Sequence, residues 1–142
     1  MAFKVFLDAN FLIDITLSRA NAAAANTVMQ ASIDGNVELY TSPAVLHITA
    51  YFTSEFYSSR QTKQIILTIL NNVKVIDCDH ATALTALSSR EMDDSEDALQ
   101  YYTALSHGVD YFISADKKLK KAAIPQLPVY TAVEFLAELA TL

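Results

Sequence analysis

The chain has 142 residues, of which 52% are hydrophobic and 18% are charged, and its formal net charge is −6. This length fits one domain that spans residues 1–142 and has its own core, and the hydrophobic content excludes a disordered chain. Two glycines and one cysteine exclude a Walker A loop, a GxGxxG dinucleotide turn, a disulfide framework and a cysteine-based zinc site.

Short apolar runs alternate with helical patterns along the chain. Strands are predicted at residues 3–7, 38–41, 74–76, 111–114 and 128–130. Helices are predicted at residues 10–17, 20–33, 43–57, 61–70, 79–87 and 96–106, followed by a short lysine-rich helix and a last helix from residue 131. Strands that alternate with helices are joined by parallel crossovers, so we expect a three-layer α/β/α domain with a central parallel sheet of four to five strands.

Several helix ends carry clear boundary signals. Ser42 followed by Pro43 is typical of an N-cap and a first helical position. Gly35 and Gly108 follow helical patterns and are expected to end them. The segment 131–134 has the spacing of a capping box, which predicts the start of the last helix.

Acidic residues follow the first and fourth predicted strands and begin the helix between them. Asp8 comes directly after the first strand, and Asp116 lies two residues beyond the fourth. Asp94, Glu96 and Asp97 cluster at the start of the preceding helix, although Asp94 and Asp116 also fit ordinary N-caps. Because ligands of open parallel sheets bind outside the carboxyl ends of the strands, these acids are expected to share one sheet edge.

Carboxylates gathered at one edge repel each other. At ~4 Å and an effective dielectric constant of about 20, one like-charged pair costs about 4 kcal/mol. Mg²⁺ or Mn²⁺ would remove that cost, because both ions favour carboxylate oxygens, and either could activate a water toward a phosphoryl group. The histidines at positions 47, 80 and 107 are scattered and lack the spacing of a zinc site.

Basic residues are concentrated in one place. The net charge of the chain repels polyanions, so contact with a nucleic acid requires a local basic patch or metal ions. Lys117 and Lys118, with Lys120 and Lys121 beyond them, follow Asp116 and are candidates for binding the phosphates of a nucleic acid. Four tyrosines, at positions 51, 57, 101 and 102, suit packing better than stacking on bases.

Four segments occur in a fixed order along the chain: VFLDANFLID (residues 5–14), TSPAVL (41–46), DSEDALQYYTA (94–104) and DYFISADKKL (110–119). Together they resemble the PIN domain family, and in particular its VapC-like bacterial ribonuclease branch. The resemblance implies an Mg²⁺- or Mn²⁺-dependent ribonuclease, and many bacterial members are toxins held inactive by a small antitoxin. By position, it implies that Asp8, Asp97 and Asp116 are catalytic metal ligands.

The same resemblance assigns secondary roles to other residues. Glu96 and Asp94 match the additional metal-binding acids of this branch, and Asn10 and Ser114 match supporting polar positions. The family usually supplies one more acid from the helix after the second strand. Here residues 42–54 contain none, because the expected position falls near His47 or Ile48.

Two other functions remain open at this point. A non-catalytic PIN-like module that binds RNA or protein would explain the missing acid. A phosphotransfer domain of receiver or haloacid-dehalogenase type also places an aspartate after a strand, but Asp8 and Asn10 do not form the D-x-D of the latter. The apolar content suggests a homodimer. The absence of an apolar run of ~20 residues and of a visible signal peptide predicts a cytoplasmic protein without a membrane segment.

Overall fold

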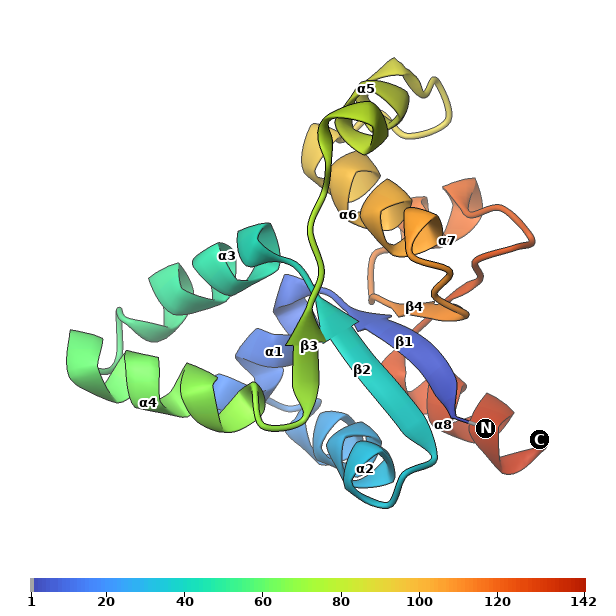
Figure 1. Cartoon of the computed structure of the whole chain (residues 1–142). Helices are drawn as coiled ribbons and strands as arrows, with labels where there is room; N and C mark the ends of the chain where they lie inside the picture. The colour runs from blue at the N-terminus through green and yellow to red at the C-terminus, as the bar shows by residue number, and fades with distance from the viewer. Residues whose placement is uncertain (1) are drawn as a thin grey trace.

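Strand β1 (Phe3–Leu7) lies at the centre of a five-stranded sheet in which every pair of neighbours is parallel (Figure 1). The computed structural model describes residues 2–142. The strand order is β3-β2-β1-β4-β5. The remaining strands are β2 (Val37–Thr41), β3 (Val73–Val75), β4 (Tyr111–Ile113) and β5 (Val129–Tyr130). The last three residues of β1 are fully buried, as expected for a central strand covered on both faces.

Helices cover both faces of this sheet, and the strand order shows how they divide. From β1 the chain moves outward to β2 and β3, and then returns across the sheet to β4 and β5. Right-handed crossovers in opposite directions place their helices on opposite faces. One face carries α1 (Ala9–Thr16), α2 (Ala22–Ile33), α3 (Pro43–Thr53), α4 (Ser59–Ile69) and α8 (Ala132–Ala140), which packs on α2. The other carries α5 (His80–Ser88), α6 (Ser95–Ser106) and α7 (Lys117–Ala122).

The predicted three-layer α/β/α domain is therefore confirmed, and most boundaries agree within two residues. The largest difference concerns α3, which ends at Thr53 although the sequence predicted a helix to residue 57. The amides of Phe56 and Tyr57 both donate to the Thr53 carbonyl, which turns the chain away from the helix axis. The capping box of Ser58 and Gln61 then starts α4 in a new direction.

The predicted helix ends are observed. Ser42 and Thr131 are N-caps whose hydroxyls accept backbone N–H groups of α3 and α8. Gly35 (φ +83°) and Gly108 (φ +69°) have left-handed backbone conformations just beyond α2 and α6, which a glycine adopts without strain. No helix within residues 2–142 is long and apolar enough to cross a membrane.

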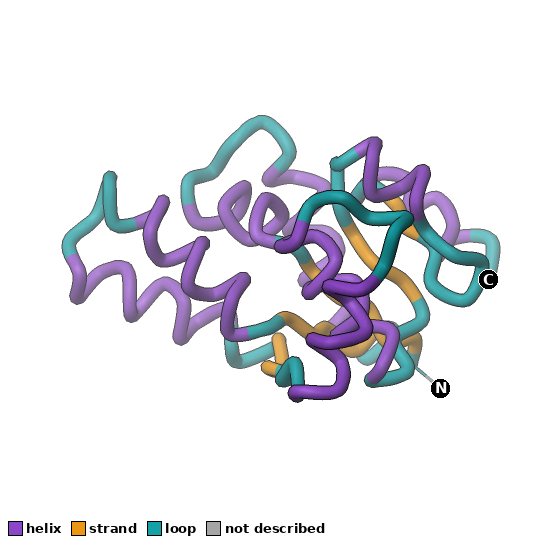
Figure 2. The backbone as a smooth tube through the Cα atoms, turned by 90° about the horizontal axis from the view of Figure 1, so that it is seen from above, coloured by secondary structure: helices purple, strands orange, loops and turns teal. Residues whose placement is uncertain are grey.

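Helices α3 and α4 form an arm that extends away from the sheet in both views (Figures 1 and 2). The end of the arm exposes large apolar side chains, including Tyr51 (62% exposed) and Phe56 (71% exposed). Where α3 ends, the hydroxyls of Thr16 and Thr53 are 2.8 Å apart and join α1 to α3. The arm is thus anchored by a buried contact and ends in an uncovered apolar surface.

Candidate active site

The candidate site lies where the strand order changes direction. β1 and β4 are neighbours, with Leu7 opposite Ile113, and the Asp8 amide continues the pairing by donating to the Ile113 carbonyl at 3.3 Å. The crossovers leave these two strands toward opposite faces, so a crevice opens between their carboxyl ends. Asp8 and Ser114 are the first residues beyond the two strands and lie in this crevice.

A small cavity of about 70 Å³ occupies this crevice. Six of the residues predicted from the sequence line it: Asp8, Asn10, Glu96, Asp97, Ser114 and Asp116. They come from the ends of β1 and β4 and from the beginnings of α1, α6 and α7. The fold therefore brings together carboxylates that lie up to 108 positions apart in the sequence. We call this space the acidic cavity.

Asp8 occupies the deepest position of the three central acids. It is the N-cap of α1, and its Oδ1 accepts the Phe11 amide at 2.9 Å. Burial raises the pKa of Asp8 from 3.8 to about 6, despite hydrogen bonds from Phe11 and Ser114 that favour the ionised form. The negative charges of Asp14 and Asp116 raise it further. The protein alone therefore does not compensate the charge of Asp8.

Asp97 lies in the first turn of α6, and its negative charge is also not compensated by the protein. Burial raises the pKa of Asp97 from 3.8 to about 6, and the carboxylates of Asp94 and Asp116 raise it further. Asp94 is the N-cap of this helix, and its Oδ1 accepts the Asp97 amide at 2.9 Å. The interaction with Asp116 shows that α6 and α7 present their acids to each other.

Asp116 is held by the start of its own helix. Its Oδ1 accepts the amides of Lys118 at 2.8 Å and Leu119 at 3.2 Å, and its own amide donates to the Ser114 hydroxyl at 3.1 Å. Asp8 and Asp116 each use Oδ1 for a helix cap. Asp8 and Asp116 can therefore each act as a helix N-cap through Oδ1 and still present Oδ2 to the site.

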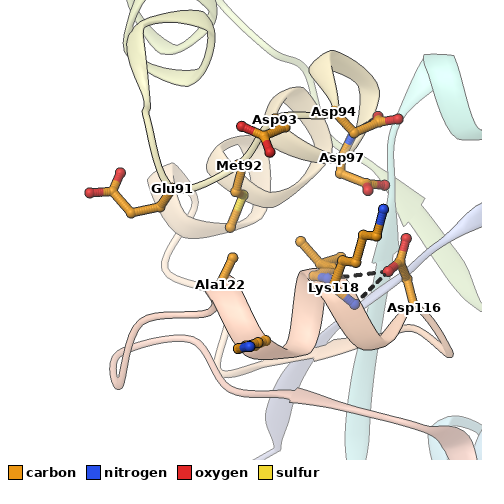
Figure 3. A pocket seen from close by; sticks show the side chains of 10 residues that line it. Glu91, Met92, Asp93, Asp94, Asp97, Asp116, Lys118 and Ala122 are labelled. Atoms are coloured by element: carbon orange, nitrogen blue, oxygen red, sulfur yellow. Dashed lines mark hydrogen bonds between the residues drawn. The ribbon is translucent and has the colours of Figure 1, made fainter.

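A larger cavity of about 800 Å³ adjoins the acidic cavity and shares Asp97 and Asp116 with it (Figure 3). We call it the lysine cavity. Lys118 extends across it toward the Asp97 carboxylate, and Lys121 also lines it. Asp94 lines this cavity and not the acidic one, so the two additional acids predicted from the sequence are separated: Glu96 lies in the acidic cavity and Asp94 beside it.

The lysine-rich segment is less uniform than its sequence indicated. Lys120 is paired with Glu134 at 2.6 Å and lies 5.8 Å from the centre of the Tyr130 ring, so its role is to join α7 to α8. Lys117 is exposed but lines neither the acidic nor the lysine cavity. Of the four lysines, Lys118 and Lys121 line the lysine cavity beside Asp97 and Asp116.

Of the four tyrosines that the sequence predicted to pack, Tyr101 and Tyr102 lie on α6, whereas Tyr51 (62% exposed) and Tyr57 (40% exposed) are exposed on the α3–α4 arm. Tyr101 is fully buried, and its hydroxyl donates to the Leu127 carbonyl at 2.6 Å and accepts the Ile124 amide at 2.9 Å. Tyr102 is half-buried on the same helix. Tyr101 therefore has no free ring face of the kind that base stacking requires.

On the α3 side of the site there is no carboxylate, and the polar groups found there are the neutral side chains of Ser42 and Gln100. Ser42 accepts the Val45 amide at 3.2 Å and donates its own hydroxyl to Oε1 of Gln100. His47 and Ile48 do not line the acidic cavity, whereas Gln100 does. The sequence analysis missed Gln100, although its position three residues after Asp97 places both on one face of a helix.

The donor set of the acidic cavity fits a hard divalent cation. Carboxylate oxygens are the ligands that Mg²⁺ and Mn²⁺ prefer, and the raised pKa values of Asp8 and Asp97 reflect negative charge that a cation would stabilise. Within residues 2–142, no three side chains of the His, Cys, Asp and Glu types stand close enough to hold a metal ion together. The acids thus share a cavity without converging on one point.

The raised pKa values predict an unusual dependence of stability on pH. Asp8 and Asp97 bind protons more tightly in the folded chain than their ordinary value of 3.8. Their ionisation therefore lowers the free energy of unfolding as the pH rises from about 4 to about 6. Thermal melting in EDTA across this range should show a smaller Tm gain, or a greater loss, in the parent than in the double variant Asp8→Asn, Asp97→Asn. Parallel curves for the two proteins would contradict the raised pKa values.

Comparison with known proteins identifies the family. A family model described as PIN domain matches residues 4–118, and the chain belongs to this family. This confirms the resemblance noted from the four sequence segments. A sequence comparison with curated proteins gives no significant match.

Solved structures share the fold at low sequence identity. A toxin–antitoxin complex from Klebsiella pneumoniae is 20% identical, with a TM-score of 0.69 over 90% of this chain and 97% of that chain. VapBC2 from Rickettsia felis, bound to a DNA fragment from its promoter, is 16% identical, with a TM-score of 0.69 over 91% and 98%. VapC20 from Mycobacterium tuberculosis, a toxin that cleaves the sarcin–ricin loop, is 16% identical, with a TM-score of 0.66 over 86% and 97%.

Proposed function

We propose that this chain is a metal-dependent ribonuclease that hydrolyses RNA phosphodiester bonds as the toxin of a toxin–antitoxin pair. The observation that carries the proposal is the acidic cavity, which Asp8, Asp97 and Asp116 line together at the switch point of the sheet. Two of these acids have raised pKa values, so the site carries more negative charge than the protein itself compensates. The similarity in fold to VapC20, a toxin that cleaves an RNA loop, supports RNA as the substrate.

The residues of the cavity have distinct proposed roles. Asp8, Asp97 and Asp116 would hold Mg²⁺ or Mn²⁺, with Glu96 in the same cavity as a further ligand. The bound ion would lower the pKa of a coordinated water and stabilise negative charge on the phosphoryl group. Ser114 supports this arrangement through its hydrogen bonds with Asp8 and the Asp116 amide. The other supporting residue is Asn10, which lines the same cavity.

The lysine cavity is the proposed path of the RNA backbone. Lys118 and Lys121 line it next to Asp97 and Asp116, which places positive charge beside the acids. A phosphate adjacent to the scissile one would bind there, because cations neutralise backbone charge without reading the sequence. Asp94 at the rim of this cavity would act on the electrostatics of the site and not as a direct ligand.

The partners proposed for the chain are an antitoxin and a second copy of itself. Two of the similar structures are of toxin–antitoxin pairs, which supports an antitoxin here. The exposed apolar end of the α3–α4 arm supports association in general, since Tyr51 and Phe56 are largely uncovered. The proposal of a homodimer is based on this exposed end of the arm and on the high apolar content of the chain.

A second candidate function is supported by the neutral pair of Ser42 and Gln100. Because α3 contributes no carboxylate to the acidic cavity, the site has fewer acids than the family usually supplies. A non-catalytic module that binds RNA or a protein partner would tolerate this loss. Glu96, which lines the cavity, is the residue that would replace the missing acid in the nuclease proposal.

An RNA cleavage assay with added and withdrawn metal separates the two functions. The purified chain is expected to cleave single-stranded RNA in Mn²⁺ or Mg²⁺ and to lose this activity in EDTA, because the acids bind substrate phosphate only through a cation. Activity should return when Mn²⁺ is restored in excess. RNA that stays intact in Mn²⁺ while it binds the chain would favour the non-catalytic module.

A further inference from the structure

A third cavity, of about 760 Å³, adjoins the acidic cavity on the α3 side. It shares Glu96 and Gln100 with the acidic cavity, whereas the lysine cavity shares Asp97, Asp116 and Leu119 with the acidic cavity. The start of α3, the loop before α5 and one face of α6 form its walls. The two larger cavities therefore adjoin the acidic cavity at different residues. An RNA strand with one phosphate at the acids could extend into the lysine cavity on one side and into the third cavity on the other.

The chemistry of this third cavity does not suit a phosphate. Among its lining residues, all within the described part of the chain, there is no lysine or arginine, while Asp77, Asp79 and Glu96 contribute negative charge. Its other walls include Pro43 and Leu99, which offer apolar contact. An uncharged, flat group with polar edges fits these walls better than an anion.

Gln100 supplies a polar group without a partner in this cavity. Its side chain is only 6% exposed, and its Oε1 accepts the Ser42 hydroxyl. Its Nε2 makes no hydrogen bond within residues 2–142 and is not one of the sealed polar atoms there, so its two N–H groups are accessible to a ligand. A mostly buried glutamine that lines two cavities, with its N–H groups accessible, can donate hydrogen bonds to a ligand there.

From this geometry we propose that the third cavity is a nucleobase site, in which Gln100 donates a hydrogen bond to the base next to the scissile phosphate. The proposal rests on the proposed ribonuclease function and adds where one base of the substrate lies. The base packs against Pro43 and Leu99, and its phosphate lies at the acidic cavity. The carboxylates of Asp77 and Glu96 accept hydrogen bonds only, so they favour bases with an exocyclic amino group over uracil.

Side-chain NMR tests this site without catalysis. The Gln100 NH₂ resonances, assigned by their loss in Gln100→Glu, would be followed in Mg²⁺ while AMP, CMP, UMP or ribose 5-phosphate is added, since none of these has a phosphodiester bond that could be cleaved. AMP and CMP are expected to shift these resonances at concentrations where ribose 5-phosphate, which has no base, does not. Binding of UMP is expected to be weaker by roughly tenfold, because it lacks the amino group.

Two results would overturn the nucleobase site. An equal shift with ribose 5-phosphate would show that Gln100 binds phosphate, and no shift with any saturating nucleotide would show that the amide has another role. The variant Ala44→Phe fills the cavity from an exposed position, so folding is expected to be retained. It should weaken AMP binding about tenfold, on the scale of one base contact, and leave ribose 5-phosphate unaffected.

The same measurements separate this proposal from the ribonuclease proposal. Nucleotide shifts at Gln100 in a chain that never cleaves RNA would uphold the base site and count against the nuclease alone. RNA cleavage by a chain whose Gln100 resonances do not shift with any nucleotide would uphold the ribonuclease proposal and contradict the base site. Lys118→Ala provides the matched comparison, since loss of a phosphate contact should weaken AMP and ribose 5-phosphate alike.

Discussion

Asp8→Asn is expected to stabilise the metal-free chain at neutral pH and to remove most of the stabilisation that Mn²⁺ gives to the parent. Asparagine keeps the N-cap of α1, because its side-chain oxygen can accept the Phe11 amide as Asp8 does. It also removes a buried charge whose pKa is raised from 3.8 to about 6. That shift corresponds to at most about 3 kcal/mol at neutral pH, since one pKa unit equals about 1.4 kcal/mol. Thermal melting with EDTA and with Mn²⁺ measures both effects.

Asp79→Asn is the matched control for this change. Asp79 is also an N-cap, with its Oδ1 accepting the Thr82 amide at 2.8 Å, but it is exposed and hydrogen bonds from Thr82 lower its pKa. Neutralising it should not stabilise the chain and should leave the Mn²⁺-dependent rise in Tm intact. If Asp8→Asn, like this control, neither stabilises the chain in EDTA nor reduces the Mn²⁺-dependent rise in Tm, then the charge of Asp8 is not destabilising and the acidic cavity is not a metal site.

Asp97→Asn is expected to lower the rate of RNA cleavage at least a hundredfold, on the scale of about 10–100-fold that loss of even an outer-shell metal partner costs. Asp97 lies between the acidic and lysine cavities and interacts with both Asp94 and Asp116. Its neutralisation removes a proposed ligand and changes the charge at the point where the backbone phosphate would sit. Initial rates on a labelled single-stranded RNA in Mn²⁺ measure the loss.

Glu55→Gln is the control for this loss of activity. Glu55 is exposed at the far end of α3 and lines neither the acidic nor the lysine cavity, so its charge should have no effect on cleavage. Equal rates for the parent, Asp97→Asn and Glu55→Gln would mean that the cleavage comes from a contaminating nuclease. A loss in both variants would mean that net charge, and not the acidic cavity, controls the rate.

Local signals in the sequence were sufficient for the order of the elements. Ser42, Thr131, Gly35 and Gly108 marked helix ends because capping and left-handed backbone are properties of the residue itself. The end of α3 was predicted too late, since nothing in residues 54–57 is a strong helix breaker. There the turn depends on amides that bond back to Thr53 and on the capping box that follows.

The edge of the sheet was predictable, but the distribution of residues between cavities was not. The rule that parallel strands end at one edge placed Asp8 and Asp116 together, and the structure agrees. The separation of Asp94 from Glu96 depends on which face of the α6 N-terminus turns inward, which only packing decides. Gln100 was missed because its importance comes from Ser42, a residue 58 positions earlier that the sequence analysis treated as a helix cap.

The position of β1 at the centre of the sheet has a consequence during synthesis of the chain. Asp8 leaves the ribosome early, but its strand gains β4 as a neighbour only after more than a hundred further residues have followed. The carboxylates of α6 and α7 reach Asp8 only when that late strand docks. During synthesis the acidic cavity is therefore assembled only after most of the domain has been translated.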